Sequence, residues 1–231
     1  MKKYILLPAI LISAVWCFAQ SNFSRGEDLF MQNKPKEAAA WLENSISEDP
    51  DDVMAYLYLG IVYEQTDRND EAIAVYRQII GRAGSLTANV ANNLGNVYFK
   101  KGNFQEADVM YTQALDNDRV YAQAYLGRAN AKMKRNLLRD AVYDYEQYLL
   151  LEPRSPQYQS IERLVAYIKA EFAEAERRRL VAEEAARAEA ERRQKLLDEI
   201  TASLQSAAGA SQGLSSGAEN VEGYEGEFEL E

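Results

Sequence analysis

A small residue recurs along the chain at an almost constant interval, and this period limits the possible folds more than any other feature. Gly26, Gly60, Gly95 and Ala129 are 34, 35 and 34 residues apart. Each is followed twelve residues later by an alanine and sixteen residues later by a leucine or a tyrosine. A fixed period of this length is typical of chains built from stacked copies of one supersecondary unit.

Each period reads as two helices joined by a short polar turn. Glycine or alanine on the first helix and alanine on the second allow close approach of the two axes, and the tyrosines and leucines fill the space around them. One such pair cannot bury its apolar face alone, so we expect four pairs to stack into one core. The turns are expected at Gln32-Asn33-Lys34, Asp67-Arg68-Asn69, Lys101-Gly102-Asn103 and Lys134-Arg135-Asn136.

The second period carries an almost whole motif, made of Tyr56, Leu59, Gly60, Tyr63, Ala72 and Tyr76. This pattern resembles the tetratricopeptide repeat family, and the resemblance covers about residues 22–155. It implies an all-α solenoid of helical hairpins with four repeats, at about 22–52, 53–87, 88–121 and 122–155.

Some residues depart from the family pattern. Arg25, Arg128 and Lys132 stand where apolar residues are usual. We expect their aliphatic stems to cover apolar surface while their charges reach water. The second repeat is one residue longer than its neighbours and ends in Gly84-Ser85 instead of a proline, which predicts a local change in the twist of the stack.

After the repeats, residues 156–204 predict a capping and extended charged helix. Its start carries an apolar stripe expected to pack on the fourth repeat, at Ile161, Leu164, Val165, Ile168 and Phe172. From 173 to 195 the only large apolar residues are Leu180 and Val181, and Glu precedes Arg or Lys by four residues several times. This favours a helix supported by its own ion pairs. A coiled coil formed through a weak alanine seam stays open as the alternative.

The two ends of the chain predict segments outside the solenoid. Residues 1–19 have two lysines, an apolar run and Cys17-Phe18-Ala19, the layout of a cleaved signal peptide. An uncleaved anchor and a lipid on Cys17 are the alternatives. Residues 205–231 read as a flexible linker and an acidic tail. In this tail we expect a second partner-binding motif, or else a disordered acidic end, with apolar residues at Tyr224, Phe228 and Leu230.

Composition excludes several classes of function. The chain of 231 residues has 26 Lys and Arg against 36 Asp and Glu, and this acidic balance disfavours nucleic acid as a partner. It has no histidine, and its single cysteine is Cys17. Nucleophilic systems based on Ser-His-Asp or Cys-His are therefore absent. We expect no enzyme activity, no cofactor, no metal and no small-molecule substrate.

The family resemblance implies that the first helix of each repeat lines a concave groove for peptides. A row of asparagines there could pair with the backbone of an extended peptide, because a side-chain amide both donates and accepts hydrogen bonds. Asn96 and Asn130 stand where asparagine also serves local packing, which is the competing interpretation. Lys100 and Lys134 would favour acidic ligands. The candidate groove residues are Phe23, Phe30, Leu57, Tyr58, Ile61, Asn92, Asn96, Phe99, Lys100, Gln123, Leu126, Asn130, Met133 and Lys134.

One known peptide-binding mode of the family is not supported. Terminal carboxylates are gripped there by two lysines, two asparagines and an arginine, whereas this chain has Phe23, Glu27 and Tyr58 at three of the matching positions. We therefore expect an exported scaffold, periplasmic or associated with the cell envelope, that binds other proteins or peptides. The alternative is a structural protein that self-associates through its C-terminal helix.

Overall fold

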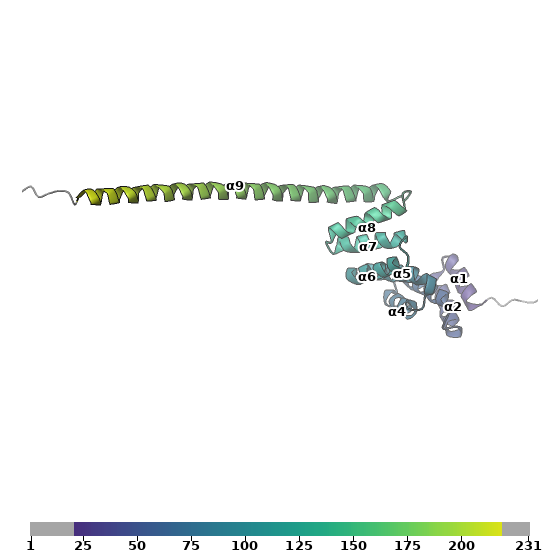
Figure 1. Cartoon of the computed structure of the whole chain (residues 1–231). Helices are drawn as coiled ribbons and strands as arrows, with labels where there is room; N and C mark the ends of the chain where they lie inside the picture. Colours follow the sequence, from purple (N-terminus) through teal and green to yellow (C-terminus); the bar gives the residue numbers. More distant parts are fainter. Residues whose placement is uncertain (1–20, 219–231) are drawn as a thin grey trace, which may run out of the picture. The chain divides into compact units, whose positions relative to one another are not determined.

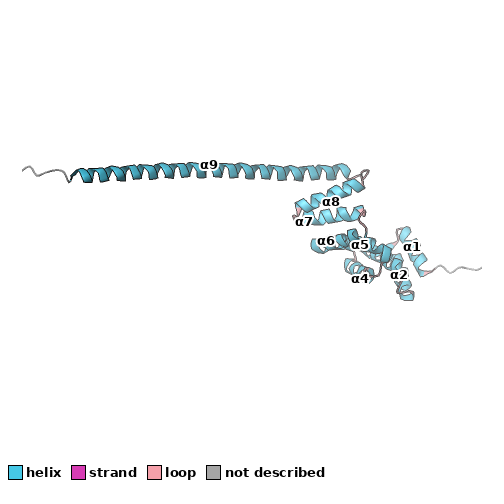
Figure 2. Cartoon of the chain, in the orientation of Figure 1, coloured by secondary structure: helices cyan, strands magenta, loops and turns pink. Residues whose placement is uncertain are grey.

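The computed structural model describes residues 21–218 and the side chains of residues 21–209. This part of the chain is helical and has no strands, as the repeat pattern predicts (Figures 1 and 2). The segment read as a signal peptide and the tail with Tyr224, Phe228 and Leu230 lie outside the described residues. The helices are α1 (Asn22–Met31), α2 (Pro35–Glu48), α3 (Val53–Gln65), α4 (Asn69–Ile79), the 3₁₀ helix η1 (Gly84–Leu86), α5 (Thr87–Lys100), α6 (Phe104–Asn117), α7 (Ala122–Lys134), α8 (Leu138–Leu151) and α9 (Tyr158–Ala218).

The four turns within the hairpins share one geometry. The second residue after the first helix of each pair has a positive φ, between 59° and 80°, at Asn33, Asp67, Gly102 and Asn136. The next residue donates its backbone N–H to a carbonyl five positions earlier, as Lys34 does to Leu29 at 2.9 Å and Asn103 to Tyr98 at 2.9 Å. This is the Schellman ending of a helix, and it explains why Asn, Asp or Gly recurs in each turn.

The hairpins are held together by close contact between small and large residues. A Cβ atom added to Gly95 would lie 2.8 Å from the ring of Tyr111, which is 2% exposed. The small residues of the period therefore admit the large side chains of the second helices. The longer second repeat differs from the others, because α4 is followed by η1, where Gly84 has a φ of 54°.

The first helices of the four pairs form one face of the solenoid. Among α1 to α8, α1 contacts α3, α3 contacts α5 and α5 contacts α7, whereas α2, α4, α6 and α8 do not contact one another. Figure 1 shows the pairs following one another along the chain. A stack whose first helices lie closer together than its second helices curves toward the first. The expected concave face is therefore made of α1, α3, α5 and α7.

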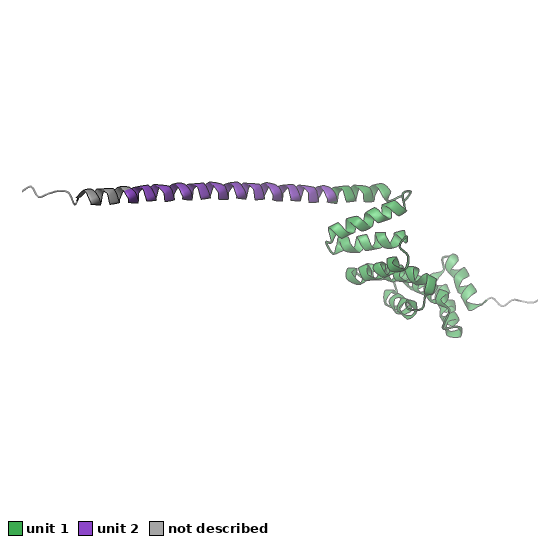
Figure 3. Ribbon diagram, in the orientation of Figure 1, with its two compact units in different colours: residues 1–168 green, residues 169–231 purple. Residues whose placement is uncertain are grey.

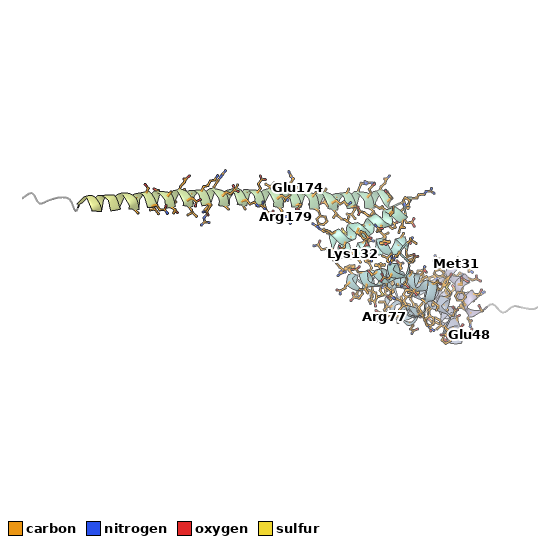
Figure 4. The ribbon with its side chains drawn as sticks, viewed as in Figure 1. Met31, Glu48, Arg77, Lys132, Glu174 and Arg179 are labelled. Carbon is orange, nitrogen blue, oxygen red and sulfur yellow. The ribbon has the colours of Figure 1, made fainter. Side chains whose placement is uncertain are left out.

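Two of the charged departures do not behave as the sequence predicts. The side chains of Arg128 and Lys132 are only 14% and 15% exposed, and both bind Asp144, which is 0% exposed. Arg128 donates to the two carboxylate oxygens at 2.6 and 2.9 Å, and the Lys132 Nζ lies 2.8 Å from Oδ2. Figure 4 labels Lys132 on α7. Their charges are buried as ion pairs because α8 supplies a buried acid. Arg25 is exposed as expected, and it lies over the ring of Trp41.

The chain divides into two compact units, one ending at Ile168 and one starting at Lys169 (Figure 3). The first unit includes the start of α9, where Ile161, Val165 and Ile168 are buried. The sequence predicted that this helix ends at Leu204, but α9 continues to Ala218. Adding a residue to an existing helix is much easier than starting one, and alanine favours the helix, so this segment prolongs α9.

Candidate functional site

A pocket of about 360 Å³ lies on the face formed by the first helices, between α5 and α7. The sequence singled out six of its eight lining residues, and the structure brings these six together. The lining consists of four amide side chains, two apolar side chains, one tyrosine and one glycine, and it contains no charged residue. It consists of Asn92, Asn96, Phe99, Tyr111, Gln123, Leu126, Gly127 and Asn130.

Tyrosines of the second helices fix the orientation of two of these amides. The Tyr111 hydroxyl donates to Asn96 Oδ1 at 2.8 Å, and the Tyr145 hydroxyl donates to Asn130 Oδ1 at 2.7 Å. Burial raises the pKa of Tyr145 to about 12 and also raises that of Tyr111, so both hydroxyls stay protonated donors at neutral pH. Both asparagines thus have a local packing role, while their Nδ2 groups form no hydrogen bond within the described chain.

Asn92 is the unusual member of the row. It is 5% exposed, and its Oδ1 atom has no hydrogen-bond partner among the described residues. Its Nδ2 makes only a long hydrogen bond, 3.4 Å, to Asn93 Oδ1. A buried carbonyl oxygen without a donor costs about 1–3 kcal/mol, and such groups usually have a partner. Asn92 lines the pocket, so the pocket wall contains an unsatisfied acceptor that is itself buried.

The two lysines predicted to attract acidic ligands differ in the structure. Lys100 is paired with Asp67 and also donates to the Glu64 carbonyl at 3.2 Å. Its charge is therefore already paired with an exposed carboxylate. Lys134 is exposed and forms no ion pair within the described residues, and Met133 beside it is half-buried. Neither of the two lysines lines the pocket.

The candidates of the first two repeats form a separate aromatic cluster. The rings of Phe23 and Phe30 meet the Tyr58 ring edge-on, with centroids 5.7 and 5.3 Å away. The Tyr58 hydroxyl donates to Glu27 Oε1 at 3.0 Å. Leu57 is buried and Ile61 is half-buried. These side chains largely pack on one another, so the structure does not join them to the pocket between α5 and α7.

Two lining residues were missed by the sequence analysis. Tyr111 was assigned only to the core, and Gly127 was not considered. A Cβ atom on Gly127 would lie 2.4 Å from the Tyr111 ring, so this ring reaches from its own repeat to the next. The signal for both is the repeat register, because Gly127 stands two residues before the small position of α7.

The described residues offer neither a metal-binding cluster nor a membrane-spanning helix. Among these side chains, no group of three or more His, Cys, Asp or Glu residues could hold a metal ion. No helix in this part of the chain combines the length and the apolar character needed to cross a membrane.

Comparison with known sequences identifies the repeats. Two family models, both described as tetratricopeptide repeat, match residues 52–119 and 92–158. Protein O-mannosyl-transferase Tmtc3 of Drosophila melanogaster is 29% identical in an alignment over 125 residues that covers 48% of this chain and 14% of that protein. A TPR repeat-containing protein of Methanocaldococcus jannaschii is 29% identical over 90 residues, 37% of this chain and 28% of its own. The chain thus spans only a small part of these relatives.

Solved structures show the same fold. PilF of Pseudomonas aeruginosa has a TM-score of 0.58 at 19% identity, over 68% of this chain and 71% of that one. MamA has a TM-score of 0.57 at 20% identity, over 63% and 84%. A tetratricopeptide repeat protein from Parabacteroides merdae has a TM-score of 0.57 at 16% identity, over 68% and 62%. At these identities the likeness concerns the fold alone.

Proposed function

The chain is a tetratricopeptide repeat protein, and on this premise we propose that it is a scaffold that binds an extended segment of another protein. The segment lies along the face of α1, α3, α5 and α7 and is anchored in the pocket between α5 and α7. Many helical-repeat folds bind their partners on such an extended concave surface.

The observation that carries this proposal is the unpartnered Asn92 Oδ1 in the pocket. Asn92 offers an acceptor once its buried amide turns toward the pocket, whereas Asn96 and Asn130 offer donors, because tyrosines occupy their oxygens. A peptide unit carries one donor and one acceptor, so an extended backbone supplies the complementary groups. Phe99 and Leu126 provide apolar surface for a side chain of the ligand.

The character of the pocket also limits the ligand. No charged side chain lines it, and Lys100 is held by Asp67. A free carboxylate would lose its hydration there without gaining a cation. The segment that fits best is therefore internal and uncharged where it enters the pocket, and a C-terminal acidic end fits poorly.

We place this scaffold outside the cytoplasm, in the periplasm or at the cell envelope, where it would bind segments of envelope proteins. The support is the sequence of residues 1–19, whose basic start, apolar run and small residues at the expected cut resemble a signal peptide. Intact mass of the exported protein tests this location. Protein starting at Gln20 is expected, whereas a lipid on Cys17 would contradict it.

Selection of peptides from a random displayed library, with the full chain as bait, tests the groove. A selected peptide should bind Asn92→Leu about two- to tenfold more weakly, because one neutral hydrogen bond is lost. Leucine stands at the matching positions 57 and 126, so the variant is expected to fold. Asn117→Ala, an exposed site on α6, is the control and should bind as the parent does. Equal affinity of Asn92→Leu, or selection of peptides by their acidic C-termini, would contradict the proposal.

A further inference from the structure

The second unit exposes large apolar side chains along α9. Leu196, Leu197, Ile200 and Leu204 are 57%, 49%, 47% and 66% exposed. Their spacings of one, three and four residues place them on one side of the helix. Apolar surface of this kind, gathered over three turns, is typical of a face that contacts a partner.

The charges of α9 extend this face toward its start. Leu197, Ile200 and Leu204 follow the three-four spacing of a heptad repeat. Residues seven, fourteen and twenty-one positions before Ile200 and before Leu197 continue the same face as two columns of side chains. One column contains Ile200, Arg193, Ala186 and Arg179, and the other contains Leu197, Ala190, Glu183 and Glu176.

The ion pairs of the helix agree with this frame. Arg179 lies 2.6 Å from Glu176 and 3.6 Å from Glu183, so these three side chains share one side of α9. Figure 4 labels Arg179 on this helix, together with Glu174. The charged residues in the column of Ile200 are therefore all basic, and those in the column of Leu197 are all acidic.

We propose that this face binds α9 of a second copy of the chain, with the two helices antiparallel. In a parallel pair in register, Glu183 would face Glu183 and Arg193 would face Arg193 of the second copy, so like charges would repel. In an antiparallel pair the basic column faces the acidic one. When the pair is centred on Ala188, Glu183 faces Arg193, Ala186 faces Ala190 and the stem of Arg179 covers Leu197.

Other partners match this face less well. Residues 169–209 contain 8 basic and 9 acidic side chains, interspersed along the helix. An anionic membrane or a nucleic acid would require a basic face, which this balance does not provide. A helix with the same mixed pattern matches it, and opposed helix dipoles add to the antiparallel arrangement. Alanine and polar layers bury little apolar area, so the association is weak and reversible.

Sedimentation equilibrium of the full chain, from low micromolar to near-millimolar concentration, tests the association. The mass should rise from monomer to dimer. Glu183→Arg and Arg193→Glu should each weaken the dimer, and the double variant should restore it. Glu184→Arg makes the same charge change outside the two columns and should leave the dimer unchanged. Circular dichroism checks that every variant keeps its helix content.

Cysteine pairing tests the direction of the helices, in a Cys17→Ser background. A mixture of Ala186→Cys and Ala190→Cys proteins should form mainly the mixed disulfide, because these positions face each other in the antiparallel pair. A monomeric mass at every concentration would overturn the proposal. So would preferential pairing of Ala186→Cys with itself, or a double charge variant weaker than both single variants. None of these outcomes depends on peptide binding in the groove.

Discussion

At the scale of single residues, the fourth repeat replaces an apolar cluster with a buried ionic one. Asp144 is fully buried between Arg128 and Lys132, and the Arg128 guanidinium also donates to Thr112 Oγ1 at 3.2 Å. The matching residues of the third repeat are Leu94, Tyr98 and Met110. The two cations were visible in the sequence as departures, but their anion comes from another helix, so only the fold shows that they are paired.

Removing the acid should strongly destabilise the solenoid. Asp144→Ala leaves two buried cations without their anion, and we expect a loss of about 3–5 kcal/mol in urea unfolding. Asp116→Ala removes an exposed acid of α6 and should change stability by no more than about 0.5 kcal/mol. A triple change to the residues of the third repeat, Arg128→Leu, Lys132→Tyr and Asp144→Met, should keep or raise the stability. A triple variant as unstable as Asp144→Ala would show that the charges themselves are required.

The site shows the same limit of sequence reasoning. The repeat register placed Asn92, Asn96 and Asn130 correctly on one face, because the period fixes which residues of each first helix share a side. It could not show which amide atoms are free. That depends on the Tyr111 and Tyr145 hydroxyls, which reach Asn96 and Asn130 from the second helices.

At the scale of helices and turns, the sequence predicts more. The turns form where Asn, Asp or Gly follows a first helix, since these residues tolerate a positive φ better than others. The predicted end of α9 was wrong, because the helix continues through Gly209, Gly213 and Gly217. The segment has no proline, and a long helix can propagate through such a stretch. Local chemistry thus fixes the turns, whereas helix length depends on cooperativity.

The shared turn geometry can be tested at Gly102, which has a φ of 80°. Gly102→Val places a β-branched residue in the left-handed region, and we expect a loss of about 1–2 kcal/mol in thermal unfolding. Gly102→Asn introduces the residue that the first and fourth turns use, so it should cost clearly less. Equal losses for both variants would mean that the side chain, and not the backbone angle, decides stability at this position.

At the scale of the whole molecule, α9 belongs to both units. The apolar stripe predicted to cap the repeats is buried at Ile161, Val165 and Ile168, whereas Leu180 and Val181 beyond it are 53% and 61% exposed. Near its start, Tyr158 and Pro153 line a pocket with Leu149 and Leu150 of α8. The first turns of α9 therefore complete the core of the first unit, as the sequence predicts for a capping helix.

Each repeat of a solenoid contacts mainly its neighbours. A substitution that destabilises this cap should therefore lower the stability of nearby repeats more than that of distant ones. Ile161→Ala truncates a buried side chain that is 7% exposed. It should lower the local free energy of unfolding by about 2–5 kcal/mol in the helices that pack on this residue. Hydrogen exchange should accelerate most in α7 and α8 and least in α1 and α2, since local opening follows local stability. Leu180→Ala, on an exposed part of α9, should leave exchange in α1 to α8 unchanged. Equal acceleration in all eight helices after Ile161→Ala would contradict this gradient. The solenoid would then unfold as one cooperative unit. In that case the cap would govern the stability of the groove as strongly as the groove residues themselves.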